Sequence, residues 1–200
     1  YENDIVELIP RNLRKSVKPY TVPEVWSEIA DFDISGASID MSKVHQDGTG
    51  GWYDAGDYQK RLFHFNNLFA LLYLYELKAP NLSDNQLNIP ESGDGIPDVL
   101  NEAEWGLKVW RNSMDENGGV SSRLLSASHP APDDPAYPYS YGKRTRYASL
   151  SFAAAAAQFA RLVKPFSASK ASEWQALAEK AYAFGTNPAN KLTNYVMHAK

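Results

Sequence analysis

Residues 147–166 read YASLSFAAAAAQFARLVKPF, and this stretch does most to decide the fold class. It predicts a helix from about residue 146 to residue 163, which Pro165 ends because proline cannot continue a helix. The alanine tract at 153–157 presents only small side chains, so neighbouring helices can approach it closely. The stretch therefore predicts a helix that packs against other helices.

A second helix is predicted after this one, across a short connection. Ser167 and Ser169 carry hydroxyl oxygens of the kind that cap a helix N-terminus, and Gly185 is a typical residue at a helix end. Between them, the residues at helical spacing are Trp174, Leu177, Ala181 and Phe184. The two helices are expected to form an antiparallel hairpin.

Two more helices are predicted earlier in the chain. From Asp57 onward, apolar side chains fill two adjacent stripes, so this helix is expected inside the fold. The next helix follows Pro97, which suits a first helical turn, and the glycines at 118–119 stop it. The stripes of the earlier helix are Leu62, Phe65, Phe69, Leu72 and Glu76, and Leu68, Leu71 and Tyr75; the later helix presents Leu100, Ala103, Leu107, Trp110 and Met114.

These patterns predict an all-α fold of antiparallel helical hairpins. No segment shows the sustained alternation of period two that a half-buried strand needs. Such hairpins stack into bundles, solenoids or closed toroids. We expect residues 1–50 to form an irregular N-terminal segment, because Pro10, Pro19, Pro23 and Gly36 interrupt it. Residues 51–200 are then the helical domain.

Composition excludes several classes of protein. A chain of 200 residues, 44% of them hydrophobic, can bury one substantial core. The net charge of -4 with interspersed signs argues against nucleic acid as a partner. No apolar run reaches the roughly 18 residues of a membrane span, and YENDIVELIP at 1–10 does not resemble a signal peptide. We expect either a cytosolic chain or one from which a leader has been removed. The absence of cysteine excludes disulfides and thiolate metal sites.

Residues 50–58 read GGWYDAGDY and place two aspartates, Asp54 and Asp57, three positions apart behind two aromatic rings. One reading makes Asp57 the N-cap of the following helix and Asp54 a turn residue. In the other, both carboxylates converge on one small volume and hold a water molecule. An inverting glycosidase uses such a carboxylate as base, with an acid roughly 6.5 to 9.5 Å away. Two aspartates this close in sequence cannot serve each other as base and acid, so the acid must come from elsewhere.

GGWYDAGDY resembles the DAGD motif of glycoside hydrolase family 9, the cellulases with an (α/α)6 toroid. Three further segments resemble the family in the expected order: LNIPESGDGIPDVLNEAEWGLKVW at 87–110, GGV at 118–120 and the alanine-rich stretch at 147–166. The resemblance implies part of such a toroid and an inverting hydrolase of β-1,4-glucosidic bonds in cellulose or related β-glucans. It implies Asp57 as general base and Asp54 as its partner in holding the water. The expected substrate is a β-glucan or cello-oligosaccharide, the expected location is secreted or periplasmic, and no cofactor is required for the chemistry.

The resemblance also assigns substrate-binding roles. Trp52 and Tyr53 border the sugar site, although packing beneath the loop is an equal alternative for each ring. Family members often carry an aromatic residue and a histidine after GGV, where this chain has Ser121, Ser122 and Arg123. Either this substrate contact is absent, or His129 in the next loop supplies it.

The general acid of the family is a glutamate near the C-terminus of a domain about twice this length, and no segment of this chain matches its surroundings. The chain therefore resembles the N-terminal half of the domain. Two other functions stay open: an exo-acting glycosidase on cello- or amino-oligosaccharides, and a catalytically incomplete, glucan-binding helical module.

The segment PESGDGIPDVLNE clusters acidic residues around glycines and suggests a structural calcium. The resemblance implies Glu91, Asp94 and Asp98 as side-chain ligands and Ile96 as a carbonyl donor. The alternative is that Asp98 and Glu102 only stabilise the N-terminus of the helix through its dipole.

Overall fold

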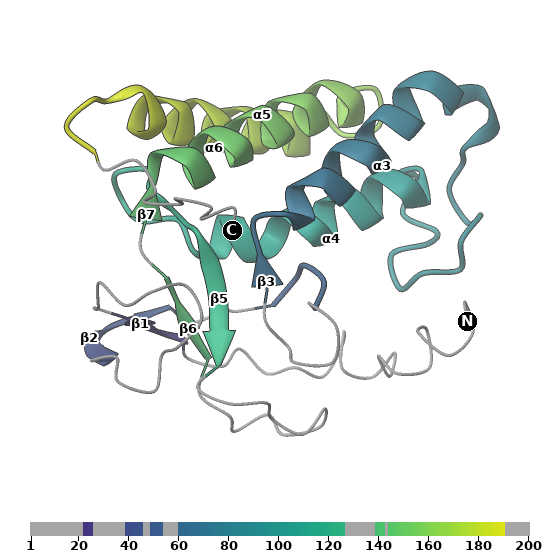
Figure 1. The fold of residues 1–200 in the computed structure, drawn as a ribbon. Helices are drawn as coiled ribbons and strands as arrows, with labels where there is room; N and C mark the ends of the chain where they lie inside the picture. Colours follow the sequence, from purple (N-terminus) through teal and green to yellow (C-terminus); the bar gives the residue numbers. More distant parts are fainter. Residues whose placement is uncertain are drawn as a thin grey trace, which may run out of the picture.

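The computed structural model describes residues 22–25, 39–45, 49–53, 60–126, 139–142 and 144–190. Within them, four α-helices form the upper layer in Figure 1, and short strands lie below. The helices are α3 (His64–Lys78), α4 (Asp98–Asn112), α5 (Arg146–Val163) and α6 (Ala168–Thr186), with a 3-10 turn, η1 (Ala79–Asn81), after α3.

The strands are short and pair mostly across long stretches of sequence. They are β1 (Val22–Val25), β2 (Ile39–His45), β3 (Lys60–Arg61), β4 (Val120–Ser121), β5 (Arg123–Ser126), β6 (Tyr139–Tyr141) and β7 (Arg144–Thr145). Five of them form one sheet in the order β2-β1-β6-β5-β3, in which β1 and β6 are parallel, and β4 pairs with β7. The antiparallel pairing of β3 with β5 is the part of this sheet that positions the candidate site.

Helices α5 and α6 form the predicted hairpin, and Trp174 of α6 is fully buried against α5. Its ring lies 5.5 Å from that of Phe159 in a T-shaped arrangement and 6.1 Å from that of Phe152. Four of the five alanines at 153–157 are buried or half-buried, which confirms the expected close packing around this tract. The hairpin is thus held by aromatic rings from one helix against rings and small side chains of the other.

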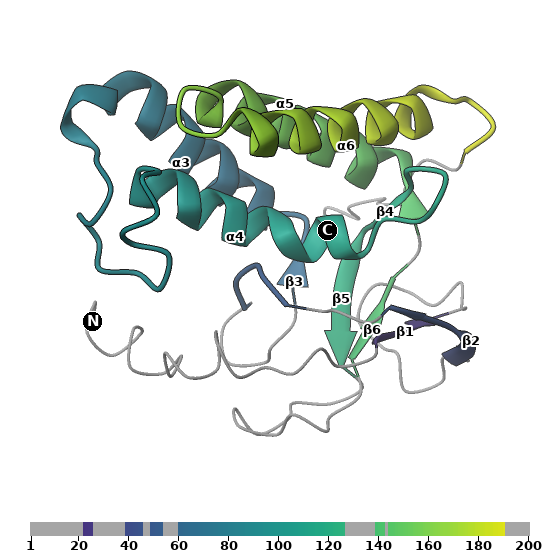
Figure 2. The same ribbon diagram turned by 180° about the vertical axis from the view of Figure 1, so that it is seen from behind.

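Helix α4 runs beneath the other helices in both Figure 1 and Figure 2 and is the most buried of them. Its Trp110 stacks on Phe65 of α3, with ring centroids 5.4 Å apart. On the side of α6, Glu104 accepts the indole N–H of Trp174 at 3.0 Å and pairs with Lys170. Helix α4 therefore joins the two ends of the helical layer.

Several predicted helix limits are confirmed. Helix α5 occupies the predicted range 146–163, and Ser167 caps α6 by accepting the backbone N–H of Lys170. Pro97 stands at the N-cap of α4, one residue before the expected first turn. Like proline at the first turn, it has no N–H to leave unsatisfied there.

The expectation that Asp57 caps the long helix is wrong. Helix α3 begins at His64, its N-cap residue is Phe63, and that cap has no side-chain hydrogen bond. Residues 60–61 pair with β5 instead of continuing a helix, so a non-local contact displaced the start of α3 by several residues.

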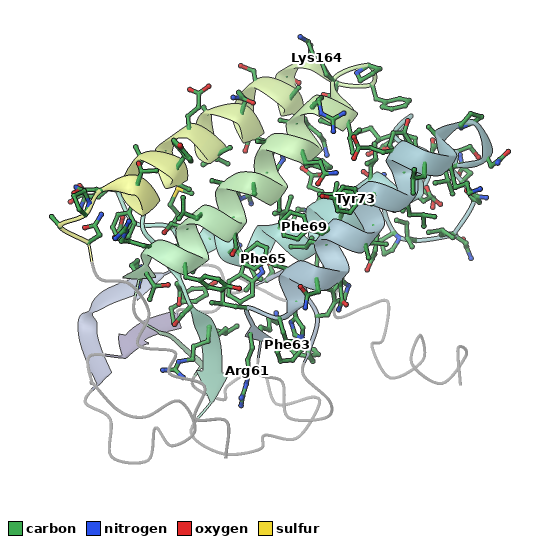
Figure 3. The ribbon with its side chains drawn as sticks, turned by 45° about the horizontal axis from the view of Figure 1, so that its top comes forward. Arg61, Phe63, Phe65, Phe69, Tyr73 and Lys164 are labelled. Carbon is green, nitrogen blue, oxygen red and sulfur yellow. The ribbon has the colours of Figure 1, made fainter. Side chains whose placement is uncertain are left out.

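The expectation that this helix lies inside the fold is not met in the described part of the chain. One stripe of α3 is buried, whereas Tyr73, Leu74 and Leu77 are 55%, 44% and 77% exposed. Figure 3 labels Phe63 before the first turn and Tyr73 farther along the same helix; Phe63 is 50% exposed. The described residues thus leave an apolar face of α3 uncovered.

Candidate functional site

The residues just before the DAGD motif lie against α4. Gly51 donates its backbone N–H to the carbonyl of Trp105 at 2.7 Å, and the indole Nε1–H of Trp105 donates to the carbonyl of Gly51 at 3.1 Å. The side-chain amide of Asn112 donates to the carbonyl of Thr49 at 3.5 Å. This exchange fixes the backbone leading into Asp54 on the rigid surface of a helix.

Two glycines permit this close approach. Gly50 and Gly51 have φ angles of +90° and +69°, a region that residues with a side chain rarely adopt. A Cβ atom on Gly50 would lie 2.8 Å from the carbonyl oxygen of Trp105, and one on Gly51 would lie 2.6 Å from Cγ1 of Val109. The pair of glycines in GGWYDAGDY is therefore required by both conformation and space.

Trp52 packs onto α4. Its Nε1–H donates to Oε1 of Glu102 at 2.7 Å, and its ring lies edge-on to His64 at 6.5 Å. Gly106 makes room for it, because a Cβ there would lie 2.4 Å from Cη2 of Trp52. These contacts favour the packing role for Trp52, and its predicted contact with sugar stays a prediction.

Tyr53 is 40% exposed, and the Nζ of Lys60 lies 4.9 Å from the centroid of its ring. Lys60 itself is only 3% exposed and donates a hydrogen bond to the carbonyl of Gly50. Sequence analysis did not identify Lys60, because lysine is among the residues least expected to be buried. An exposed ring at this position can stack on a sugar, so Tyr53 keeps both predicted roles.

Asp54 and Asp57 lie outside the described residues, as does His129. The structure places the two flanks of the aspartate pair: residues 49–53 on α4 and residues 60–61 in β3. The roles of the aspartates and of His129 therefore stay predictions.

The two serines after GGV are buried. Ser121 is fully buried, and its hydroxyl lies within hydrogen-bond distance of the carbonyls of Arg123, at 2.8 Å, and Gly142, at 2.9 Å. Ser122 is 4% exposed. Buried side chains in these positions are not available to a polysaccharide, so neither serine substitutes for the aromatic and histidine contacts that the resemblance implies.

Asp98, one of the predicted calcium ligands, is fully buried and holds the preceding loop. Its carboxylate accepts the backbone N–H of Asn85 at 3.0 Å and of Leu87 at 2.6 Å, and the hydroxyl of Ser92 at 2.9 Å. Both of its oxygens are thus engaged by hydrogen-bond donors.

Asp84 has a similar role that the sequence analysis missed. Its carboxylate accepts the backbone N–H groups of Gly93 at 2.7 Å, Gly95 at 2.8 Å and Asn85 at 2.8 Å. The hydrogen bond from Gly93 is the main reason that the pKa of Asp84 lies below its usual value. The run Ser-Asp-Asn at 83–85 could have indicated it, since aspartate in a turn commonly accepts nearby backbone N–H groups.

The surroundings of the other expected calcium donors, Asp94 and Glu91, differ from one another. Asp94 is exposed and accepts the backbone N–H of Ile96 at 2.8 Å and the amide of Asn101 at 3.1 Å. One buried oxygen of Glu91, Oε2, has no hydrogen-bond partner. Among the described residues, no three or more His, Cys, Asp or Glu side chains are grouped so as to hold a metal ion. Calcium therefore stays a prediction, supported if it raises the melting temperature and overturned if chelator has no effect.

The comparisons with known proteins point in one direction. The profile of the family described as Glycosyl hydrolase family 9 matches residues 23–200. The chain is 33% identical over 134 residues to Endoglucanase C of Cellulomonas fimi, covering 60% of this chain and 12% of the relative. It is 34% identical over 142 residues to a xyloglucan-specific endo-beta-1,4-glucanase of Bacteroides ovatus, and the match covers 67% of this chain and 24% of that relative. A cellulose 1,4-beta-cellobiosidase of Acetivibrio thermocellus is 30% identical over 156 residues, and the match covers 68% of this chain and 17% of that relative.

Solved structures give the same result for the fold. A metagenome-derived glycoside hydrolase family 9 endoglucanase matches with a TM-score of 0.62 and 29% identity, covering 89% of this chain and 35% of that one. A Bacteroides ovatus GH9 structure matches with a TM-score of 0.64 and 28% identity, and the match covers 83% of this chain and 30% of the solved one. The helical hairpins are therefore part of an (α/α)6 toroid, as predicted, and the chain spans about a third of these solved chains. No helix in the described ranges has the length and apolarity needed to span a bilayer.

Proposed function

The chain belongs to glycosyl hydrolase family 9, and from this premise we propose that it cleaves β-1,4-glucosidic bonds in cellulose or a related β-glucan with inversion of configuration. The observation that carries the proposal is the family match over residues 23–200, which includes the aspartate pair of GGWYDAGDY. The printed names of the relatives support it, since one is an endoglucanase and the other two carry the β-1,4 bond in their names.

In this proposal Asp57 is the general base. Its carboxylate takes a proton from a water molecule while the oxygen of that water forms a bond to the anomeric carbon and the bond to the leaving oxygen breaks. Asp54 accepts a second hydrogen bond from the same water and orients it. The base must be ionised to act, so its surroundings must stabilise the negative charge of the carboxylate. It must also be held in position toward the water, which requires a fixed backbone.

The described flanks support this chemistry by their rigidity. The hydrogen bonds between Gly51 and Trp105 and the packing of Trp52 on Gly106 fix the entry to the motif on α4. The exposed ring of Tyr53 lies directly before Asp54 and offers a flat apolar surface to a pyranose. We propose Tyr53 as the substrate-binding ring of this segment.

The proton for the leaving oxygen has no assigned donor in this chain, which decides the choice of test substrate. A 2,4-dinitrophenyl β-cellobioside releases a phenolate that needs no protonation, so its hydrolysis depends on the base and not on the acid. We expect the chain to release dinitrophenol from it, and Asp57→Ala to lose about 10²-fold or more of that rate. Equal rates in Asp57→Ala and the unchanged chain would remove Asp57 as the base.

A matched variant separates the base from general damage to the site. Tyr53→Phe keeps the ring beside Asp54 and should keep the rate of dinitrophenol release within a few-fold. Binding of cellohexaose to the Asp57→Ala variant should also persist, because the base is not the main source of substrate affinity. Binding without any release by the unchanged chain would indicate the alternative of a glucan-binding module.

Exo action is the second candidate, favoured by the match to a cellulose 1,4-beta-cellobiosidase. Viscosity of a soluble cellulose solution distinguishes the two modes. Endo action lowers the viscosity early, relative to the number of reducing ends formed, whereas exo action releases cellobiose with little change in viscosity. Because a polymeric substrate does not enter cells, we also propose a secreted or periplasmic location.

A further inference from the structure

Phe63 presents an exposed aromatic ring at the end of α3 that lies next to β3. The residue is 50% exposed, whereas its neighbours Leu62 and His64 are 9% and 4% exposed. Figure 3 shows Phe63 near Arg61 and apart from Tyr73, so it does not belong to the apolar face farther along the helix. A single exposed apolar side chain is ordinary on a protein surface, so its role depends on what surrounds it.

A series of ring contacts holds Phe63 in place. Its ring packs edge-on against that of His64, with centroids 4.5 Å apart and planes at 83°. The ring of His64 lies edge-on to Trp52 at 6.5 Å, and the indole N–H of Trp52 donates to Glu102 of α4 at 2.7 Å. The exposed ring therefore rests on a buried and a half-buried ring that are anchored to α4. A ring fixed in this way loses little conformational entropy when a ligand binds to it.

The same contacts bring Phe63 close to Tyr53, a second exposed ring. Tyr53 directly follows Trp52, and Phe63 directly precedes His64. The contact between Trp52 and His64 therefore brings together the two backbone segments that carry the exposed rings. Tyr53 is 40% exposed, and the Nζ of Lys60 lies 4.9 Å from the centroid of its ring. Two supported aromatic rings thus flank one internal contact.

We propose that Phe63 is a substrate-binding residue, whose exposed ring stacks on a pyranose ring of the β-glucan beside the position of Tyr53. This inference rests on the proposed function, which makes a β-glucan the substrate. The hydroxyl groups of a β-1,4-glucan are equatorial, so each sugar face presents C–H groups to the partly negative face of an aromatic ring. Phe63 has no polar group in its side chain and therefore contributes contact area and no hydrogen bond.

A binding experiment by NMR tests this contact without any catalysis. In a chain labelled with ¹³C-phenylalanine, the ring signals of Phe63 are assigned by their loss in Phe63→Leu. On addition of cellohexaose, we expect nuclear Overhauser effects between the ring protons of Phe63 and the axial C–H protons of a sugar. A complex in which Phe63 shows no such contact would overturn the proposal, and so would a chain that binds no cellohexaose.

Three substitutions separate an aromatic contact from a merely apolar one. Phe63→Ala removes the ring, and we expect the affinity for cellohexaose to fall about fivefold or more. Phe63→Leu keeps an apolar side chain but has no flat face, so it should lose affinity by a similar factor. Phe63→Trp keeps an aromatic face and should bind within about twofold of the unchanged chain. Full affinity in both Phe63→Ala and Phe63→Leu would overturn the proposal.

Tyr182→Ala is the matched control, since Tyr182 is 60% exposed on α6 and the substitution also removes an exposed ring. It should leave the affinity unchanged. An equal loss in Tyr182→Ala would overturn the assignment to Phe63. Because Phe63 also packs against His64, the free energy of unfolding of each variant is measured as well. If Phe63→Ala does not fold, Phe63→Leu and the NMR contact still decide the question.

The binding and hydrolysis results together separate this inference from the proposed function. A chain that binds cellohexaose through Phe63 but releases no dinitrophenol from the dinitrophenyl β-cellobioside would contradict the proposed function and not this inference. A chain that releases dinitrophenol, while Phe63→Ala and Phe63→Leu bind cellohexaose as tightly as the unchanged chain, would contradict this inference alone.

Discussion

Gly51 and Asp84 show how single residues shape the described part of the site. Gly51 has a positive φ and lies against Val109, so its missing side chain is required twice. Asp84 and Asp98 accept backbone N–H groups from the loop before α4 and give it order. The missing side chain of Gly51 lets the backbone before Asp54 pack beside α4, and the carboxylates of Asp84 and Asp98 hold the backbone of the loop that leads into α4.

A matched pair of glycine variants tests the close approach to α4. Gly51→Ala adds a Cβ that would lie 2.6 Å from Val109, whereas Gly95→Ala, also at positive φ, meets open space. Both share the conformational cost, so the difference between them isolates the clash. We expect Gly51→Ala to lower the free energy of unfolding by about 1 to 3 kcal/mol more than Gly95→Ala, measured by chemical denaturation. Equal effects would contradict the packing described for this segment.

The lowered pKa of Asp84 predicts a pH dependence of stability. Because the hydrogen bond from Gly93 favours the ionised carboxylate in the folded state, its contribution is present above the ordinary pKa of aspartate. It is lost as the pH falls through the pKa of the folded state. Asp84→Asn should therefore be less stable than the unchanged chain at neutral pH, and the two should converge on acidification.

Denaturation curves at a series of pH values from neutral to acidic measure this difference directly. A gap between the two proteins that stays constant across the whole series would show that the ionisation of Asp84 contributes nothing to stability.

Among the elements, α4 has the central position. It carries Trp105 and Gly106 toward the motif, Trp110 toward α3, and Glu104 toward α6. A displacement of α4 would change the backbone before Asp54 directly, since Gly51 is hydrogen-bonded to it in both directions. The polar contact between α4 and α6 therefore has consequences for the candidate site.

A double-mutant cycle on Glu104 and Lys170 tests that contact. The side chain of Glu104 is 10% exposed and that of Lys170 is 33% exposed, so solvent screens part of their attraction. We expect a coupling free energy of about 1 kcal/mol between Glu104→Gln and Lys170→Met in thermal or chemical unfolding. The pair of Arg111 and Glu173 joins the same two helices at 3.6 Å and is the control; it should couple more weakly, because the side chain of Glu173 is 56% exposed. A coupling no larger than that of the control would assign the α4–α6 contact to apolar packing alone.

The sequence predicted elements well where the determining signals are local. The limits of α5 follow from helical spacing and from Pro165, and the start of α6 follows from Ser167. The strands could not be predicted from the sequence, because they are two to seven residues long and several pair with distant segments. The same non-local pairing explains why the start of α3 was predicted too early.

In the candidate site, too, the residues of the local motif were predicted and the contacts between distant residues were not. The glycines and rings of GGWYDAGDY were found by motif, and the structure gives Trp52 a packing environment and leaves Tyr53 exposed. The burial of Lys60 depends on the approach of Gly50 and Tyr53, which no local pattern indicates. The two backbone hydrogen bonds that Asp98 accepts likewise come from residues more than ten positions away.

At the scale of the whole molecule, the chain spans about a third of the solved family structures named above. The exposed apolar face of α3, with Tyr73, Leu74 and Leu77, is uncovered by the described residues. The described helices and strands nevertheless carry both flanks of the aspartate pair on a continuous core. The proposed function places the base at Asp57, between these flanks, and names no donor for the proton of the leaving oxygen.

The most direct test of the account is the configuration of the first product. Hydrolysis of the dinitrophenyl β-cellobioside is followed by ¹H NMR of the anomeric protons, from the first minutes and before mutarotation equilibrates them. A single displacement by water activated at Asp57 predicts that α-cellobiose appears first and the β anomer only later. Initial formation of β-cellobiose would show a double displacement and would contradict the role given to Asp57.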